Sequence, residues 1–280
     1  MIEEVAQRLW PGRPLRVEPL GGGITNRNFR VDVGGESFVL RIGGKDTELL
    51  GIDRSVEHRA SLVAAELGIG PEVVAFVEPE GYLVTRYLEG EVGRVDLERA
   101  GRTLRAIHDG PTIPGRFDGF RVVEAYAATA VVRGIALPAA YERAQVIAGA
   151  IERRRGRPPL RPCHNDLLSA NFIDDGERLR IVDWEYAGMG DPYFDLGNFA
   201  ANQELDGKGE RELLDAYGTR DADALVLMRF MSDFREAMWG VVQQAISELD
   251  FDFRDYAEEH FERLERTASE ARFRRALDAT

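Results

Sequence analysis

The chain has 280 residues, of which 44% are hydrophobic and 30% are charged, so it can bury a sizeable core and form two lobes in one compact unit. Its formal net charge of −13 argues against nucleic acid as a partner, because phosphate backbones are bound by clustered lysine and arginine. No apolar run reaches the ~18 residues of a membrane span, no export signal is visible and one cysteine excludes an internal disulfide, so we expect a cytoplasmic protein without a membrane partner.

Strands and helices are predicted to alternate over the first ninety residues. Short apolar runs bounded by glycine and proline indicate strands, and apolar residues at three-four spacing after Asp53 indicate a helix that this residue caps. In chain order we expect a helix over 2–10, a strand leading to Leu20, strands over 29–33 and 37–42, a helix over 55–67, and paired strands over 73–77 and 82–87. The segment is therefore predicted to form a mixed α/β lobe.

A glycine loop over residues 21–26 lies between two of these strands. Glycine lets backbone amides approach a triphosphate without interference from a Cβ atom. The spacing does not fit a P-loop, and the strand expected after the loop disfavours a dinucleotide fingerprint. A glycine turn that only joins two strands would look much the same. If the loop covers a nucleotide, the candidate contacts are Gly22, Gly23, Thr25 and Asn26.

A glycine-spaced linker over 88–93 precedes a region that is predicted to be mainly helical. We place the boundary near residue 89, which gives lobes of residues 1–89 and 90–280. Apolar residues at three-four spacing indicate long helices, each with a side that faces the core, over 97–108 and 222–249.

The most informative stretch runs from His164 to Asn171 and continues to Asp183. Short apolar runs on either side of Asp174-Asp175-Gly176-Glu177 indicate a hairpin, which brings Asn171 and Asp183 side by side. Phosphoryl transfer from a nucleotide needs such a set: a carboxylate, here Asp166, to take a hydroxyl proton, and oxygen ligands for Mg²⁺. A hairpin with a solvated acidic rim is the alternative.

His164, Asp166, Asn171 and Asp183 together resemble the catalytic and metal-binding loops of the protein-kinase-like small-molecule phosphotransferases. That superfamily contains choline and ethanolamine kinases and aminoglycoside phosphotransferases. The continuation over 183–198 is most similar to the bacterial choline kinase branch. The resemblance implies an α+β, bilobal protein-kinase-like fold, with a small β-rich amino-terminal lobe, a mainly helical carboxy-terminal lobe, and ATP and Mg²⁺ as cofactors.

The same resemblance implies the nucleotide contacts. In kinase-like folds a basic residue on the third strand contacts the α and β phosphates and pairs with a helix glutamate. Arg41 and Glu57 would take these roles, although an ion pair between strand and helix without a ligand would use the same residues. The backbone near Tyr87 and Leu88 would receive the adenine ring.

Residues around the reacting groups are assigned by the resemblance as well. Glu185, two residues after Asp183, would help to hold a second Mg²⁺, and a solvated hairpin end is the alternative. His164 and Asp195 would brace the catalytic loop through hydrogen bonds, so neither is taken as the base.

A quaternary ammonium group is recognised by aromatic faces with a carboxylate nearby. For such an acceptor we select Tyr193, Trp239 and Asn202 as substrate-binding residues, although aromatic rings on helices more often belong to the core. Asn202 stands where eukaryotic-type choline kinases carry an acidic residue, and the nearest acid is Glu204. Further candidates are Tyr186, Phe234 and Glu236.

The function expected from these residues is transfer of the γ-phosphoryl group of ATP to the hydroxyl of a small amino alcohol, with choline as the first candidate. A kinase of another small hydroxylated molecule, such as an aminoglycoside, a sugar or a hydroxylated amine, is the alternative enzyme. A catalytically silent nucleotide-binding protein is the alternative from another class, and the complete set of Asp166, Asn171 and Asp183 argues against it. ATP or GTP as the donor, the number of Mg²⁺ ions and the oligomeric state stay open.

Overall fold

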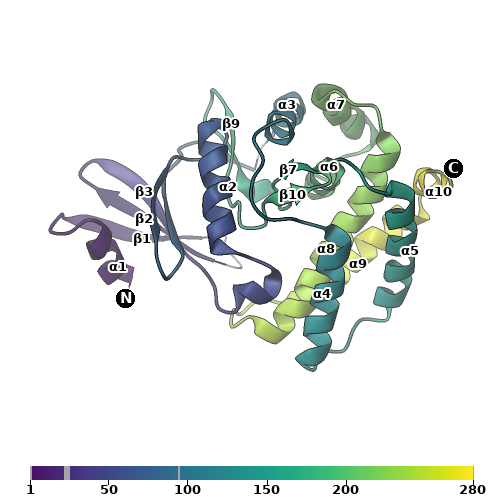
Figure 1. The fold of residues 1–280 in the computed structure, drawn as a ribbon, viewed down its shortest axis with the longest axis horizontal. Coiled ribbons are helices and arrows are strands. Elements are labelled where there is room, and N and C mark those ends of the chain that lie inside the picture. The colour runs from purple at the N-terminus through teal and green to yellow at the C-terminus, as the bar shows by residue number, and fades with distance from the viewer. Residues whose placement is uncertain (1, 22–25, 94, 280) are drawn as a thin grey trace.

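The computed structural model describes residues 2–21, 26–93 and 95–279, and a five-stranded antiparallel sheet forms its amino-terminal end. Figure 1 shows this sheet at one end of the molecule, the helices at the other, and the two termini at opposite ends. The strand order is β1-β2-β3-β5-β4. The elements of this part are α1 (Ile2–Leu9), β1 (Leu15–Leu20), β2 (Arg27–Val33), β3 (Glu36–Ile42), η1 (Thr47–Leu50), α2 (Arg54–Glu66), β4 (Val73–Val77) and β5 (Tyr82–Arg86).

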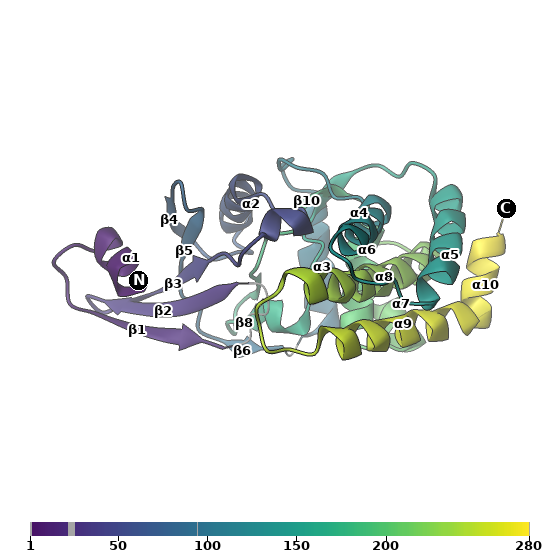
Figure 2. The ribbon, with the colours of Figure 1, turned by 90° about the horizontal axis from the view of Figure 1, so that it is seen from below.

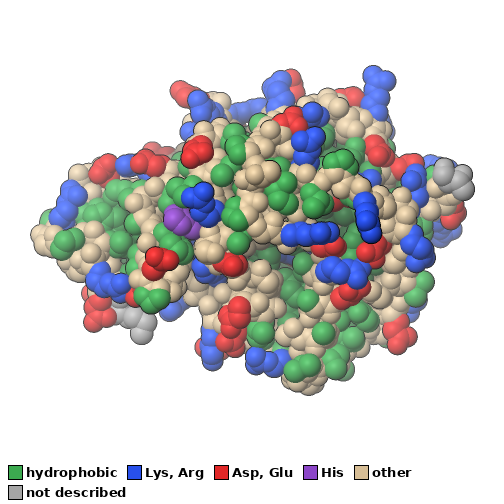
Figure 3. Space-filling model, viewed as in Figure 1, with side chains coloured by type: hydrophobic (Ala, Val, Ile, Leu, Met, Phe, Trp, Pro, Cys, Tyr) green, Lys and Arg blue, Asp and Glu red, His purple; other side chains and the backbone are tan. Residues whose placement is uncertain are grey.

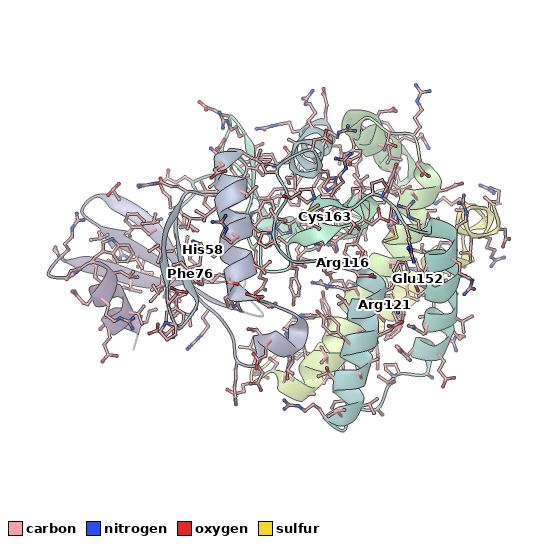
Figure 4. All side chains as sticks on the ribbon, in the orientation of Figure 1. His58, Phe76, Arg116, Arg121, Glu152 and Cys163 are labelled. Carbon is pink, nitrogen blue, oxygen red and sulfur yellow. The ribbon has the colours of Figure 1, made fainter. Side chains whose placement is uncertain are left out.

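The sheet has its own small core. Val31, Leu40 and Val84 are fully buried and cluster with apolar residues of α1. The helix α2 contacts β4, where His58 stacks on Phe76 with the ring centroids 4.4 Å apart (Figure 4). Because α2 packs against the sheet, the buried side of α2 has a fixed position relative to β3.

Short strands lie among helices in the rest of the chain. The strand β8 pairs with β9 and with β6, and β7 pairs with β10, all antiparallel. These elements are β6 (Glu91–Val92), α3 (Leu97–His108), α4 (Gly119–Val132), α5 (Ala140–Arg155), β7 (Arg161–Cys163), η2 (Ser169–Asn171), β8 (Phe172–Asp174), β9 (Leu179–Ile181), β10 (Gly188–Gly190), α6 (Pro192–Asn202), α7 (Gly207–Tyr217), α8 (Ala222–Ile246), α9 (Phe253–Ser269) and α10 (Ala271–Asp278).

The helix α8 is the centre of the helical part. It packs against α4, α6 and α9, and Figure 2 shows α9 running alongside it. Phe230, Phe234 and Met238 on α8 are fully buried in the largest apolar cluster. Arg121 on α4 and Glu152 on α5 form an ion pair of 2.7 Å between neighbouring helices (Figure 4). None of the described helices, including the 25 residues of α8, is long and apolar enough to cross a membrane.

The predicted α+β arrangement is confirmed, and every helix and strand expected in the first ninety residues is present within a few residues of its predicted bounds. The strands β7 and β10 were not predicted, because three-residue strands carry no periodic signal. The lobe boundary near residue 89 stays a prediction; the change from sheet to helix falls between β5 and α3. On the face drawn in Figure 3, acidic and basic side chains are interspersed.

Candidate active site

The predicted catalytic loop, residues 164–171, follows β7 and is held by the carboxylate of Asp195 on α6. The backbone N–H groups of His164 and Asn165 donate to its two oxygens over 2.8 and 2.7 Å. His108 contacts the same carboxylate through Nε2 at 3.0 Å. Because Asn165 has a positive φ of 67°, these bonds also secure a backbone conformation that L-residues rarely adopt. Asp195 thus orients the residues that precede Asp166.

His164 joins the catalytic loop to the hairpin. Its Nδ1 accepts from the backbone N–H of Asp166 at 3.2 Å, and its Nε2 donates to the carbonyl of Val182 at 3.0 Å. Burial lowers the pKa of His164 to about 4, so the ring is neutral and carries its proton on Nε2. The ring therefore holds the two segments together, and its role as a brace for catalysis stays a prediction.

Helix α6 lies against the loop and is hydrogen-bonded to its backbone. The backbone N–H of Leu167 donates to Asn198 Oδ1, and Asn202 Nδ2 donates to the carbonyl of Leu167 at 3.3 Å. Gly197 allows α6 to touch α8, because a Cβ at this position would lie 2.5 Å from the backbone nitrogen of Arg229. The side chain of Asn202, predicted to bind the substrate, thus contacts the loop backbone.

The hairpin brings Asn171 and Asp183 together. The backbone N–H of Val182 donates to the carbonyl of Asn171 at 3.0 Å, and Asp183 follows directly with a positive φ of 69°. Asn171 Nδ2 donates to the carbonyl of Asp166 at 2.8 Å, which leaves its Oδ1 for another partner. Carboxylate and amide oxygens suit a hard divalent cation, so this donor set fits Mg²⁺.

Arg41 on β3 lies at the centre of a cluster of carboxylates. Its guanidinium contacts Glu57 of α2 at 2.8 Å, Asp183 at 2.5 Å and Glu185 at 3.1 Å. Burial disfavours its charge, but these three carboxylates outweigh burial and raise the pKa of Arg41 above its usual value. Among the described residues, its Nε has no hydrogen-bond partner. Arg41 is therefore always positively charged, and its Nε–H group remains available to a ligand.

Arg54 is a second cation of this cluster that the sequence analysis missed. It contacts Glu57 at 2.6 Å and Glu185 at 3.0 Å, and its Nη2 donates to Asn26 Oδ1 at 2.9 Å. Asn26 in turn donates to Glu185 at 2.9 Å. The i,i+3 spacing of Arg54 and Glu57 on one helix was the available signal. Arg54 connects Asn26, the last residue of the glycine loop, to α2 and to the hairpin.

A second charged cluster meets Asp166 from α8. Arg235 Nη1 contacts Asp166 Oδ1 at 3.2 Å and Glu236 Oε1 at 2.5 Å, and its guanidinium lies 4.3 Å from the ring centre of Tyr186. Burial raises the pKa of Asp166 to about 8, while Arg235 acts in the opposite direction and Glu236 adds to the increase. Asp166 is thus a buried carboxyl between an arginine and several acids, a setting typical of a catalytic base.

The other predicted site residues lie as follows. Trp239 is buried and donates its indole N–H to the hydroxyl of Tyr186 at 3.1 Å, close to Arg235. Tyr193 bonds Thr219 at 2.7 Å and stacks against Arg155, so its described contacts are away from Asp166. Both adenine candidates, Tyr87 and Leu88, are half-buried directly after β5. The predicted contacts Gly22, Gly23 and Thr25 lie outside the described residues.

The family model described as "Phosphotransferase enzyme family" matches residues 16–231. The chain belongs to this phosphotransferase family. The stated resemblance, the protein-kinase-like fold and the predicted enzyme class are therefore confirmed. The predicted roles of individual site residues stay predictions.

The similarity to individual relatives extends over most of the chain. A choline/ethanolamine kinase family protein from Mesorhizobium loti is 33% identical, with a TM-score of 0.83, over 99% of this chain and 98% of that one. Protein LicA of Haemophilus influenzae is 28% identical over 70% of this chain. The matched region spans 61% of that LicA protein, which is less than two thirds of its length. Human ethanolamine kinase 2 is 24% identical over 92% of this chain and 77% of its own length.

Proposed function

We propose that the protein transfers the γ-phosphoryl group of MgATP to the hydroxyl of a small amino alcohol, with choline as the reference acceptor. The observation that carries this proposal is the position of Asp166. Its buried carboxyl is contacted by Arg235 on one side, and its own loop is bonded to Asn171, next to Asp183 and Arg41, on the other. A base between a phosphate-binding cluster and a second enclosed cluster suits transfer between two bound substrates.

On the nucleotide side, Arg41 would exchange its contacts with Asp183 and Glu185 for oxygens of the α and β phosphates. Its planar guanidinium and its unpartnered Nε support this exchange. Mg²⁺, when bound, would neutralise phosphate charge, and Asn171 Oδ1 and Asp183 are the oxygens that would hold it. Glu57 keeps Arg41 in place throughout, because it is buried on the packed helix α2.

On the acceptor side, Asp166 takes the proton of the reacting hydroxyl. The hydroxyl oxygen forms a bond to the γ phosphorus, the bond from that phosphorus to the bridging oxygen breaks, and ADP leaves. The hydrogen bonds that the loop backbone donates to Asp195 and His164 hold the backbone of Asp166 in place before the reaction begins. Positioning of the base therefore precedes substrate binding.

The negative charge of the site and the names of several relatives support an amino alcohol as the acceptor. Glu236 is buried beside Asp166 and supplies negative charge for an ammonium group. Several relatives are named for choline or ethanolamine phosphorylation, including the Mesorhizobium loti protein and human ethanolamine kinase 2. The net charge of −13 agrees with a cationic substrate.

The test is acceptor-dependent release of ADP from MgATP. The panel contains choline, ethanolamine, their methylated relatives, neutral sugars and an aminoglycoside. We expect turnover with the amino alcohols and only background hydrolysis with the sugars. Turnover with sugars alone would show that the acceptor is a sugar and not an amino alcohol. Nucleotide binding without turnover of any alcohol would identify a silent nucleotide-binding protein.

A further inference from the structure

Arg235 is the most deeply buried charged group next to the catalytic aspartate. Its side chain is 1% exposed, and the Nη1 group alone serves both Glu236 and Asp166. The guanidinium carbon lies over the ring of Tyr186, 4.3 Å from the ring centre. Since α8 is packed on several sides, the helix holds this cation in a fixed place. Neither substrate-binding predictions from the sequence nor the phosphate cluster accounts for it.

The other edge of this guanidinium is unused. Within the part of the chain that the structure describes, neither Nε nor Nη2 of Arg235 has a hydrogen-bond partner, and both atoms are shielded from solvent. Buried donors are rarely left without a partner, because the desolvation of each N–H is then uncompensated. Nε and Nη2 point their N–H bonds in parallel, which is the geometry that matches the two oxygens of a carboxylate.

We propose that Arg235 determines acceptor specificity by binding a carboxylate of the acceptor along this Nε–Nη2 edge. The acceptor would then be a zwitterionic amino alcohol, with a hydroxyl, an ammonium and a carboxylate on one small carbon frame. This inference rests on the proposed phosphotransfer function and narrows its substrate. Binding requires a small rearrangement that opens the shielded edge to the ligand, as is common when side chains at a site adjust.

The neighbouring charges favour a zwitterion over a plain cation. Arg235 and Glu236 form a buried pair of opposite charges, so a ligand with the reverse arrangement satisfies both members. Glu236 Oε2 accepts from the hydroxyl of Tyr256 at 2.9 Å and retains lone pairs for an ammonium. A ligand with only a positive charge would leave the free edge of Arg235 without a partner.

The aromatic rings near Arg235 also favour a zwitterionic acceptor over a trimethylammonium one. A trimethylammonium group needs open aromatic faces, but Arg235 already covers Tyr186. Trp239 meets the rings of Phe253 and Tyr256 edge to face, at 5.7 and 5.4 Å between centroids. An ammonium that donates hydrogen bonds to Glu236 therefore suits this cluster better than a methylated one.

The experiment compares acceptors that differ only by a carboxylate: ethanolamine with serine, and propanolamine with homoserine. For the wild-type enzyme we expect kcat/KM to be higher for the carboxylated member by at least about tenfold, because only that member pairs the free edge. Arg235→Met should abolish this preference, mainly through KM of the carboxylated acceptor, with KM for ATP little changed. Arg235→Lys keeps the charge opposite Glu236 and Asp166 but lacks the paired N–H edge, so it should lose most of the preference.

Arg229→Met is the matched control, because Arg229 lies on the same helix and pairs with Glu210 at 2.6 Å, away from Asp166. It should keep the wild-type acceptor ratio. A wild-type enzyme that prefers the uncarboxylated members, or an Arg235→Lys enzyme with an unchanged ratio, overturns the inference and leaves amino-alcohol phosphorylation standing. Failure to phosphorylate any of these acceptors or choline would overturn the proposed function and this inference with it.

Discussion

Asp166 is the residue on which the proposed reaction depends most. The Asp166→Asn variant keeps the shape of the side chain but cannot accept the hydroxyl proton. We expect MgATP affinity to stay close to wild type and kcat to fall by ~10²–10⁴-fold, because the nucleotide does not need the base. Calorimetric titration with MgATP and a coupled ADP assay measure the two quantities. Wild-type turnover in the variant would refute the role of Asp166 as the base.

Burial of the same carboxyl makes stability depend on pH. Asp166 has a pKa of about 8 in the folded, unliganded protein, against about 4 in an unfolded chain, so the folded state binds more protons between these values. Its contribution to stability is full below pH ~4 and is lost as pH rises through about 8. Asp166→Asn removes this loss. The gain in Tm of the variant over wild type should therefore be larger at high pH than at low pH, and an unchanged difference would contradict a buried charge.

The two proposed metal ligands allow a comparison between a charged and a neutral oxygen donor. Asp183→Ala should abolish activity at every Mg²⁺ concentration, whereas added Mg²⁺ should partly rescue Asn171→Ala, since a carboxylate contributes more to a hard cation than an amide does. Initial rates over a magnesium series measure the difference. If the initial rates of both variants are equally insensitive to the Mg²⁺ concentration, the hairpin is not the metal site.

Residues that belong to a spaced motif could be predicted, and isolated ones could not. Asp166, Asn171 and Asp183 form a pattern whose chemistry is recognisable without a structure. Arg235 is a single arginine on a helix, and Arg54 offers only its i,i+3 spacing to Glu57; most such residues are solvated. Only the packing of their helices shows that both are turned toward carboxylates of the site.

At the scale of elements, local signals decided what was predictable. The β8–β9 hairpin was predicted because a turn sequence separates two apolar runs, and it has the expected antiparallel pairing. The strands β7 and β10 are far apart in the chain and only three residues long. No local sequence pattern therefore predicts their pairing. That pairing nevertheless sets the start of the catalytic loop.

Contact between α6 and α8 depends on Gly197. An added Cβ would meet the backbone of α8 at 2.5 to 2.6 Å, so the helices would have to separate. Gly197→Ala should cost ~1–3 kcal/mol of stability, a size typical of overpacking, and should reduce activity because Asp195 and Asn198 lie on the same helix. Gly149→Ala on α5 is the control, since its Cβ would meet only a flexible arginine end at 3.6 Å. Thermal unfolding should show a loss for the first variant and an unchanged or higher Tm for the second.

For the whole molecule, distant segments supply the two sides of the proposed active site. Arg41, Arg54 and Glu57 come from the sheet region, while Arg235 and Glu236 come from the centre of the helical part. The hairpin and the catalytic loop stand between them and carry Asp166. The family and the two-part fold were predictable from the sequence, because the motif identifies both. The meeting of the two charged clusters at one carboxyl required the structure.

Transfer of label from ATP to an alcohol tests the central claim most directly. ATP labelled at the γ phosphate is incubated with magnesium, the amino-alcohol acceptors and either wild-type protein or Asp166→Asn. The account predicts that wild-type protein moves the label into a phosphate ester of the acceptor and that the variant does so at least ~10²-fold more slowly. Label found only in inorganic phosphate, or transferred equally by both proteins, would contradict it.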